Sequence, residues 1–190
     1  MGEYEKKLED RCILLGISGG ISAYKSAELA SQLTQAGAEV NTVMTENACR
    51  MIGPRTLQAI TRNPVYTTMW GDPQQFIRDH TDLAGSSDIA AVVPATANII
   101  AKAANGICDD LLSTLLCAAW EKPTVYAPAM NTHMWNNPAV QKNVKTLADY
   151  GRIIAGPETG HLACGYEGTG RMSEPDKIFS IICEALSDNR

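Results

Sequence analysis

Glycine and hydroxyl residues follow the first apolar run of the chain and could bind a phosphate group. Residues 16–25 read GISGGISAYK, with Gly19 and Gly20 directly after Ser18. Glycines let the backbone approach an anion, free N–H groups at a helix start attract phosphate, and the Ser18 hydroxyl can add a donor. The spacing matches neither the dinucleotide-binding G-x-G-x-x-G pattern nor a P-loop. The segment therefore predicts a phosphate site, with an ordinary tight turn as the alternative.

Two further polar turns follow strand-like segments. Residues 45–48 read TENA, and residues 94–98 read PATAN. Taken alone, Thr45 is best explained as a helix N-cap. Because the carboxyl ends of parallel strands share one sheet edge, the three turns outline the crevice in which open α/β sheets bind ligands. They predict a cofactor site without naming the cofactor.

Large apolar side chains and an amide share one short segment. Residues 128–135 read PAMNTHMW, which places Asn131 between Met130 and Met134. Such side chains suit a planar ligand or a subunit contact, whereas a packed loop is the alternative.

A cysteine and an arginine stand among glycines in the segment ACGYEGTGRM, residues 163–172. The surrounding residues, 158–173, show neither helical nor strand periodicity, and an aperiodic loop of this length is usually functional. The composition predicts a mobile flap with a reactive thiol, Cys164, and an anion-binding guanidinium, Arg171. A disordered surface loop is the alternative.

The histidines form no recognisable pattern. His80, His133 and His161 are far apart in the sequence and belong to no metal-ligand cluster or Ser-His-Asp arrangement. The spacing therefore predicts no metal site, and each histidine is interpreted as structural unless other evidence raises it.

The elements that must position these residues alternate between strand and helix. Short apolar or alternating runs predict strands at residues 12–17, 39–44, 88–93, 124–127 and 152–155, with Pro94 ending the third. Helical patterns lie at residues 21–36, 46–60 (interrupted by Pro54), 97–104, 109–120, 138–150 and 175–186. The alternation predicts one three-layer α/β domain over residues 1–190, with a parallel sheet of flavodoxin-like or Rossmann-like type, after an N-terminal extension over residues 1–10.

Composition excludes several classes of protein. The 190 residues carry a net charge of -5 without any run of Lys or Arg, which argues against a nucleic-acid partner. No apolar stretch approaches the roughly 20 residues that span a bilayer, and the N-terminus does not resemble a secretory signal. Six cysteines without a C-x-x-C pair indicate reduced thiols, hence a cytoplasmic protein. A charged fraction of 19% hints at surface buried between subunits.

Taken together and in this order, the motifs resemble the homo-oligomeric flavin-containing cysteine decarboxylase family. The resemblance covers residues 11–177 and is most specific at PAMNTHMW and PATAN. In that family the first glycine turn holds the FMN phosphate. A histidine shortly before the strand that leads into the Pro-Ala block is catalytic there, and His80 occupies that position. The resemblance implies an FMN site formed by Ser18, Gly19, Gly20, Thr45, Asn47, Pro94, Ala95, Thr96 and Asn98.

The glycine-rich flap separates branches of the family. It looks like the substrate-covering flap of phosphopantothenoylcysteine decarboxylases, whose cysteine acts in the last step. The resemblance thus implies FMN-dependent conversion of 4′-phosphopantothenoylcysteine to 4′-phosphopantetheine in coenzyme A synthesis, by thiol oxidation, decarboxylation and re-reduction of the enethiol. His80 would act as base, Asn131 would hold the substrate carboxylate and Cys164 would deliver the final proton. Met134 and Arg171 would also contact substrate.

The resemblance also implies partners and alternatives. Family members form trimers or larger homo-oligomers with FMN at subunit contacts. The C-terminal ligase domain of the bifunctional bacterial enzyme is expected to be supplied by a separate synthetase. The alternatives are a peptidyl-cysteine decarboxylase, a flavin prenyltransferase or a non-catalytic regulatory subunit of the same fold.

Overall fold

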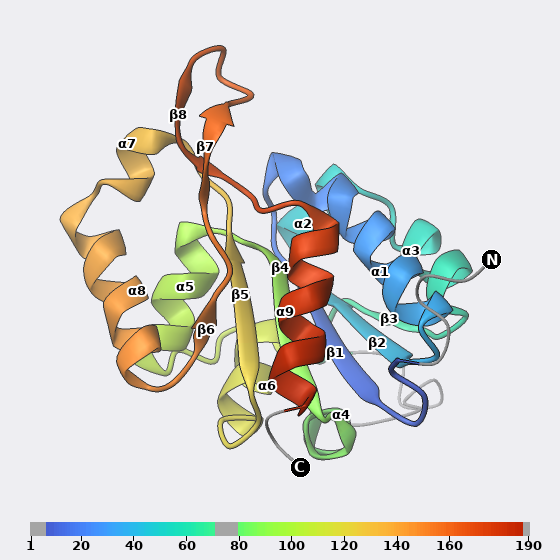
Figure 1. Cartoon of the computed structure of the whole chain (residues 1–190). Coiled ribbons are helices and arrows are strands. Elements are labelled where there is room, and N and C mark those ends of the chain that lie inside the picture. Colours follow the sequence, from blue (N-terminus) through green and yellow to red (C-terminus); the bar gives the residue numbers. More distant parts are fainter. Residues whose placement is uncertain (1–6, 71–79, 188–190) are drawn as a thin grey trace.

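The computed structural model describes residues 7–70 and 80–187, and of His80 only the backbone. Its centre is a six-stranded parallel sheet (Figure 1). In chain order the strands are β1 (Cys12–Ile17), β2 (Glu39–Met44), β3 (Val65–Tyr66), β4 (Ile89–Ala95), β5 (Thr124–Pro128) and β6 (Ile153–Ile154). Across the sheet the order is β3-β2-β1-β4-β5-β6, so the strand order reverses between β1 and β4. The predicted three-layer α/β fold is confirmed.

Burial on both faces explains the central strands. Five of the six residues of β1 and of β2 are buried, as are all seven residues of β4. Such strands need nearly continuous apolar sequence, which CILLGI and IAAVVPA provide. The prediction that Pro94 ends the third strand is wrong, because β4 continues to Ala95. Its register with β5 shifts between Val92 and Ala95, and such an irregularity accommodates a residue without an N–H group.

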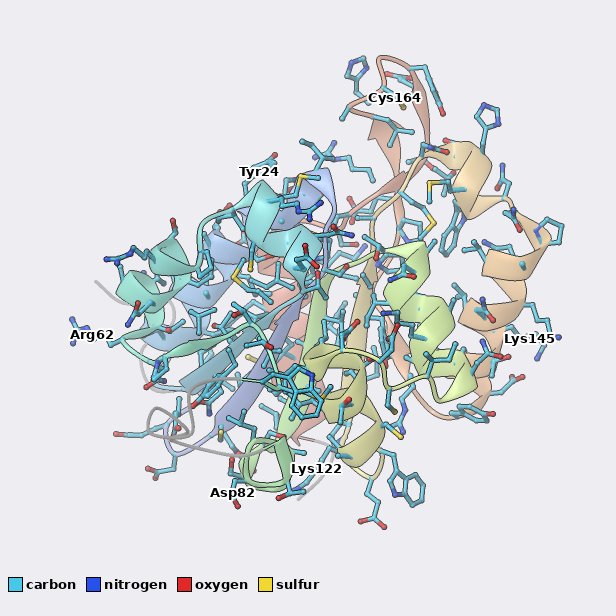
Figure 2. All side chains as sticks on the ribbon, turned by 180° about the vertical axis from the view of Figure 1, so that it is seen from behind. Tyr24, Arg62, Asp82, Lys122, Lys145 and Cys164 are labelled. Carbon is cyan, nitrogen blue, oxygen red and sulfur yellow. The ribbon has the colours of Figure 1, made fainter. Side chains whose placement is uncertain are left out.

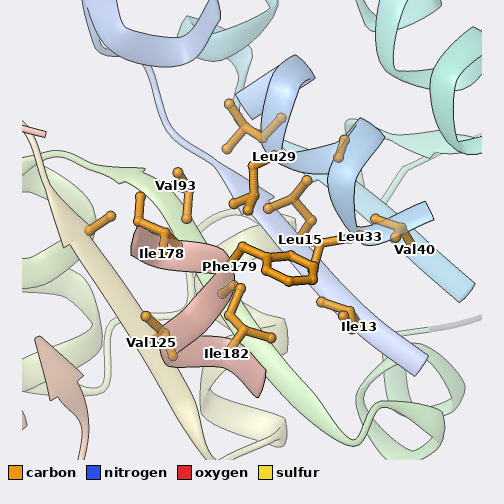
Figure 3. Close-up of a cluster of buried hydrophobic side chains, with 14 of the residues drawn as sticks. Ile13, Leu15, Leu29, Leu33, Val40, Val93, Val125, Ile178, Phe179 and Ile182 are labelled. Atoms are coloured by element: carbon orange, nitrogen blue, oxygen red, sulfur yellow. The ribbon is translucent and has the colours of Figure 1, made fainter. Parts of the chain in front are cut away.

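One face of the sheet is covered by η1 (Ile21–Tyr24), α1 (Lys25–Gln35), α3 (Pro54–Thr61) and α9 (Pro175–Ser187). Figure 3 shows Phe179 and Ile182 of α9 among Leu15 of β1 and Leu33 of α1. Burying each such side chain stabilises the fold by about 1.5–3 kcal/mol. The helix predicted from residue 21 begins instead as a 3-10 turn and becomes α-helical at Lys25.

The other face is covered by α4 (His80–Ser86), α5 (Ala97–Asn105), α6 (Leu111–Ala118) and α8 (Pro138–Asp149). The start of α6 is fixed by a capping box in which the Asp110 side chain accepts from the Ser113 N–H and the Ser113 hydroxyl accepts from the Asp110 N–H. Two short helices follow β2 and β5 after one and three residues: α2 (Glu46–Met51) and α7 (Thr132–Trp135). They place their first residues at the carboxyl edge of the sheet.

The segment expected to be an aperiodic flap is an antiparallel hairpin with a register shift between Glu158 and Thr159. It consists of β7 (Glu158–His161) and β8 (Glu167–Arg171), so the loop interpretation is wrong for most of its length. Its strands contain only polar residues and glycine, which is why no apolar alternation announces them. Figure 1 shows the hairpin projecting beyond the carboxyl edge of the sheet, beside α7.

Within the described ranges, no helix combines the length and the apolar character that crossing a membrane requires. The side chains described there also bring no three histidine, cysteine, aspartate or glutamate residues together as metal ligands.

Candidate active site

The first glycine turn is fastened to the turn after β4 by Ser18. Its hydroxyl donates to the Pro94 carbonyl at 2.8 Å and accepts from the Thr96 N–H at 3.0 Å. The side chain is buried and therefore joins the ends of β1 and β4, where the strand order reverses. Because the hydroxyl proton of Ser18 is already donated to the Pro94 carbonyl, its predicted role as a donor to a phosphate stays a prediction.

The two glycines keep this edge bare of side chains. A Cβ atom on Gly19 would overlap the Asn47 side chain, and one on Gly20 would lie 3.4 Å from Cγ2 of Thr96. Thr96 caps α5 by accepting from the Ile99 N–H at 3.5 Å. The turn can therefore present its backbone to a ligand, as the sequence predicts.

A pocket of about 410 Å³ opens between this edge, α7 and the hairpin. From the predicted site residues it brings together those of the glycine turn, the turn after β4, the amide segment and the hairpin: Gly19, Gly20, Thr96, Asn131, Met134, Cys164 and Arg171. Exposed apolar side chains of η1 and α7 add to its lining, namely Ile21, Tyr24 and Met134. Such a wall suits a planar aromatic ligand.

Other predicted residues lie at the same sheet edge but do not line this pocket. Thr45 caps α2 by accepting from the Ala48 N–H at 3.2 Å, and Asn47 packs against Gly19. Pro94 and Ala95 are buried in β4, and Asn98 is exposed on α5. Their contact with a cofactor stays a prediction.

Asn131 has one defined orientation. Its Oδ1 accepts from the Met134 N–H at 2.9 Å and so caps α7. With the oxygen held in the cap, the Nδ2 group is the end that can donate, which fits the predicted contact with a carboxylate.

The hairpin packs directly on the turn that carries Asn131. The Met130 N–H donates to the Gly170 carbonyl at 3.0 Å. A Cβ atom on Gly168 would overlap the Thr132 hydroxyl, and one on Gly170 would overlap the Met130 carbonyl. Close contact with this turn thus explains Gly168 and Gly170 of the flap motif, and the hairpin is held beside the pocket.

Cys164 lies at the hairpin tip together with Tyr166, to which the sequence assigned no role. A hydrogen bond to Cys164 raises the pKa of Tyr166, while a backbone hydrogen bond from Thr132 lowers it. The Tyr166 ring also meets His133 edge to face, with centroids 6.1 Å apart. Tyr166 therefore links the cysteine to the start of α7. This proximity depends on the hairpin, which the sequence pattern does not predict.

A second group missed by sequence reasoning contains Lys25. Its Nζ lies 2.6 Å from Oε2 of Glu174, and the Arg171 guanidinium pairs with Oε1 of the same carboxylate. Lys25 and Arg171 both line the pocket. Hydrogen bonds from Lys25 and then from Arg171 lower the pKa of Glu174.

The histidines are dispersed. His161 lines the pocket and His133 lies on α7. The backbone of His80 begins α4, and its side chain lies outside the described residues. Figure 2 shows Asp82 of α4 and Cys164 at opposite ends of the molecule. One chain therefore does not bring α4 to the pocket.

Comparison with known proteins agrees with this geometry. A family profile described as Flavoprotein matches residues 1–187. The "Coenzyme A biosynthesis bifunctional protein CoaBC" of Bacillus subtilis (strain 168) is 47% identical over 174 residues, 92% of this chain and 43% of that protein. The chain thus spans less than half the length of the bifunctional relatives it matches. The "Probable phosphopantothenoylcysteine decarboxylase" of Streptococcus mutans serotype c (strain ATCC 700610 / UA159) is 39% identical over 175 residues, 92% of this chain and 98% of that protein.

Solved structures show the same likeness. The FMN-dependent cysteine decarboxylase SpaF has a TM-score of 0.79 at 36% identity and covers 95% of this chain and 98% of its own. A PPC decarboxylase mutant complexed with pantothenoylaminoethenethiol has a TM-score of 0.78 at 32% identity and covers 90% of this chain and 96% of its own.

Proposed function

The chain belongs to the flavoprotein family, and we propose that it catalyses the FMN-dependent decarboxylation of 4′-phosphopantothenoylcysteine to 4′-phosphopantetheine in coenzyme A synthesis. One observation carries the proposal: a single pocket is lined by the glycine turn after β1, by Asn131 and by Cys164. These three features supply a place for a phosphorylated cofactor, a carboxylate donor and a proton donor. We place the reaction in the cytoplasm, where six free thiols are stable.

The residues present fit FMN. Gly19 and Gly20 leave bare backbone at the sheet edge, and Ile21 and Tyr24, 65% and 62% exposed, offer apolar surface beside it. FMN, when bound, supplies a reversible two-electron oxidation of the carbon that bears the substrate thiol, which allows the neighbouring carboxylate to leave. Gly19, Gly20 and Thr96 would hold it at the edge where the strand order reverses.

Asn131 would orient the substrate. Because its oxygen is fixed in the α7 cap, its Nδ2 group would donate to the substrate carboxylate and hold the cysteine end against the cofactor wall. Met134, 44% exposed on the same helix, would cover the apolar part of that end.

Cys164 would supply the last proton. It lies on the hairpin that lines one side of the pocket, where it would donate a proton as the enethiol is converted to a saturated thiol. Tyr166, whose pKa is raised chiefly by its interaction with Cys164 and whose ring meets His133 of α7, would position the sulfur. We expect Cys164→Ser to release a product two hydrogens lighter than 4′-phosphopantetheine, measured by mass spectrometry.

His80 would act as the base near the thiol and carboxylate, and it would act from a second copy. The helix that begins at His80 lies at the far end of the molecule from Cys164 (Figure 2). A site that contains both residues therefore requires a homo-oligomer, and we propose a trimer or a multiple of trimers. The exposed side chains of Ile21 and Tyr24 offer apolar surface for such a contact.

The direct test is anaerobic incubation of the FMN-loaded protein with 4′-phosphopantothenoylcysteine, followed by mass spectrometry. Loss of carbon dioxide alone would establish the complete reaction. A product that has also lost two hydrogens would indicate a reaction that stops at the enethiol, as in the peptide branch. Absence of turnover would contradict the proposal and favour the alternative functions, a flavin prenyltransferase or a non-catalytic regulatory subunit.

A further inference from the structure

Two cations converge on one carboxylate at the wall of the pocket. Lys25 stands at the start of α1, Arg171 ends β8, and Glu174 follows it shortly before α9. Nζ of Lys25 lies 2.6 Å from Oε2 of Glu174, and Arg171 pairs with Oε1. The Lys25 side chain is only 15% exposed, whereas those of Arg171 and Glu174 are 42% exposed. A lysine so far withdrawn from water is found where an anion balances it.

The charges of this cluster do not balance. Lys25 and Arg171 contribute two positive charges against the single negative charge of Glu174. The neighbouring pair of Lys177 and Glu158, 2.9 Å apart, is neutral. This wall therefore carries one surplus positive charge in a chain whose net charge is -5. A pocket wall of this kind attracts an anionic ligand.

The donors are suited to a phosphate. The guanidinium of Arg171 has five N–H donors in a planar fork, and the ammonium of Lys25 has three. Glu174 engages one nitrogen of each side chain and so holds the two cations side by side, with their remaining N–H donors free of this carboxylate. Such paired, oriented cations recognise phosphate more strongly than an isolated surface lysine does.

The position fits the far end of the substrate. Lys25 is separated from the glycine turn by η1, and four residues of a 3-10 helix rise about 8 Å. Asn131 and Met134 lie on α7, a different wall of the same pocket. A long substrate whose carboxylate meets Asn131 can thus extend its other end toward the cationic wall.

Resting on the proposed function, we propose that Lys25 and Arg171 form the subsite for the terminal phosphate of the substrate. The glycine turn would remain the site of the cofactor phosphate. The subsite makes the enzyme select the phosphorylated substrate over its unphosphorylated counterpart.

The test compares substrates that differ only in this phosphate. For Lys25→Met, we expect the KM for 4′-phosphopantothenoylcysteine to rise about tenfold to one-hundredfold, the effect of losing a charge-assisted hydrogen bond. The KM for unphosphorylated pantothenoylcysteine should stay within about twofold of its wild-type value. Arg171→Met should act in the same direction, and Lys25→Arg should restore much of the preference. Lys177→Met, which removes a neighbouring cation that does not line the pocket, is the matched control.

Two further readouts separate the alternatives. The affinity of Lys25→Met for FMN, measured by fluorescence titration, should equal that of the wild type. A loss of FMN affinity without loss of the preference for the phosphorylated substrate would assign Lys25 to the cofactor site and overturn the proposal. An equal rise in KM for both substrates would show that the ion pair is purely structural, and this would also overturn the proposal. Calorimetric binding of 4′-phosphopantothenate and pantothenate tests the subsite without turnover. If wild-type protein turns over neither substrate yet binds the phosphorylated ligand more tightly through Lys25, the proposed function fails and the subsite stands.

Discussion

Asn131 uses the two ends of its side-chain amide for different tasks. Oδ1 caps α7 at 2.9 Å from the Met134 nitrogen, and Nδ2 remains for the substrate. Asn131→Asp keeps an oxygen for the cap but replaces the donor by a second, charged acceptor. We expect this variant to keep the wild-type melting temperature within about 2 °C, since the cap survives. Its kcat/KM should fall at least about one-hundredfold, because a carboxylate repels the substrate carboxylate.

Asn131→Ala provides the matched comparison, because it removes the cap and the donor together. It should lower the activity, because the donor is lost. It should also lower the melting temperature, because loss of the cap costs about 1 kcal/mol of unfolding free energy. If Asn131→Asp keeps the wild-type kcat/KM, Asn131 does not bind the substrate carboxylate.

Glu174 carries the pH dependence of the cationic wall. Hydrogen bonds from Lys25 and Arg171 lower its pKa from the ordinary value of 4.5. A lowered pKa in the folded state means that the stabilisation is complete above the unfolded pKa and is lost as the pH falls through the folded pKa. We expect Glu174→Gln to lower the melting temperature by about 2 °C at pH 7, because the carboxylate is partly exposed and such pairs contribute at most about 1 kcal/mol.

Thermal unfolding followed by circular dichroism at several pH values checks this dependence. The difference between wild type and Glu174→Gln should persist at pH 5 and close only below the ordinary value of 4.5. A difference that stays constant down to pH 3 would show that the carboxylate stabilises the fold by its shape and not by its charge.

At the scale of elements, the position of the hairpin depends on the contact between β8 and α7. A Cβ atom on Gly168 would overlap the Thr132 hydroxyl, which is buried without a hydrogen-bond partner among the described residues. Gly168→Ala should therefore displace β8 from the pocket, raise the KM about tenfold and expose the hairpin to limited proteolysis, while the core remains intact. Gly53→Ala is the control, since nothing lies within 4 Å of a Cβ atom there.

A second substitution tests the cause. Thr132→Ala removes the overlapping hydroxyl, which gives up no hydrogen bond seen in the structure, so the double variant should recover most of the lost affinity. If the double variant is as impaired as Gly168→Ala alone, the hairpin position depends on something other than this contact.

The elements differ in how far the sequence determines them. The bounds of β1 and β2 are predicted to the residue, because β1 is an uninterrupted apolar run and β2 shows strand-like alternation. The hairpin escapes prediction, because ETGH and EGTGR alternate no apolar residues and β8 packs against Met130 and Thr132, which are distant in the sequence. β3, a two-residue edge strand, lies in no predicted segment, whereas β6 lies inside the strand predicted at residues 152–155, which is two residues too long. Elements this short give no reliable periodic signal.

The same limit applies to the site. Asn131 and Cys164 stand in motifs, so residue type and spacing suffice to single them out. Lys25 stands in a motif too, but its significance comes from Glu174, 149 positions later in the chain. Tyr166 likewise gains its meaning only when the hairpin brings it to Thr132 and His133. Contacts between distant segments are decided by the fold and leave no local pattern.

At the scale of the whole molecule, one chain carries an incomplete set of the proposed catalytic residues at its pocket. The pocket contains Asn131 and Cys164, while the helix that begins at His80 lies at the opposite end (Figure 2). In a closed ring of identical copies, each interface can join the pocket of one subunit to the α4 helix of the next. The number of complete sites then equals the number of such interfaces.

This geometry predicts complementation between two inactive variants. His80→Ala and Asn131→Ala should each be inactive alone, because every interface lacks one of the two residues. In oligomers formed by co-expressing equal amounts of both, an interface is intact when the pocket comes from the His80→Ala subunit and α4 comes from the Asn131→Ala subunit. Random assembly makes about one quarter of the interfaces intact, so about a quarter of the wild-type activity should return. The two proteins mixed after separate assembly serve as the control and should stay inactive. If co-expressed oligomers of verified mixed composition also stay inactive, both residues act within one chain and the shared site is wrong.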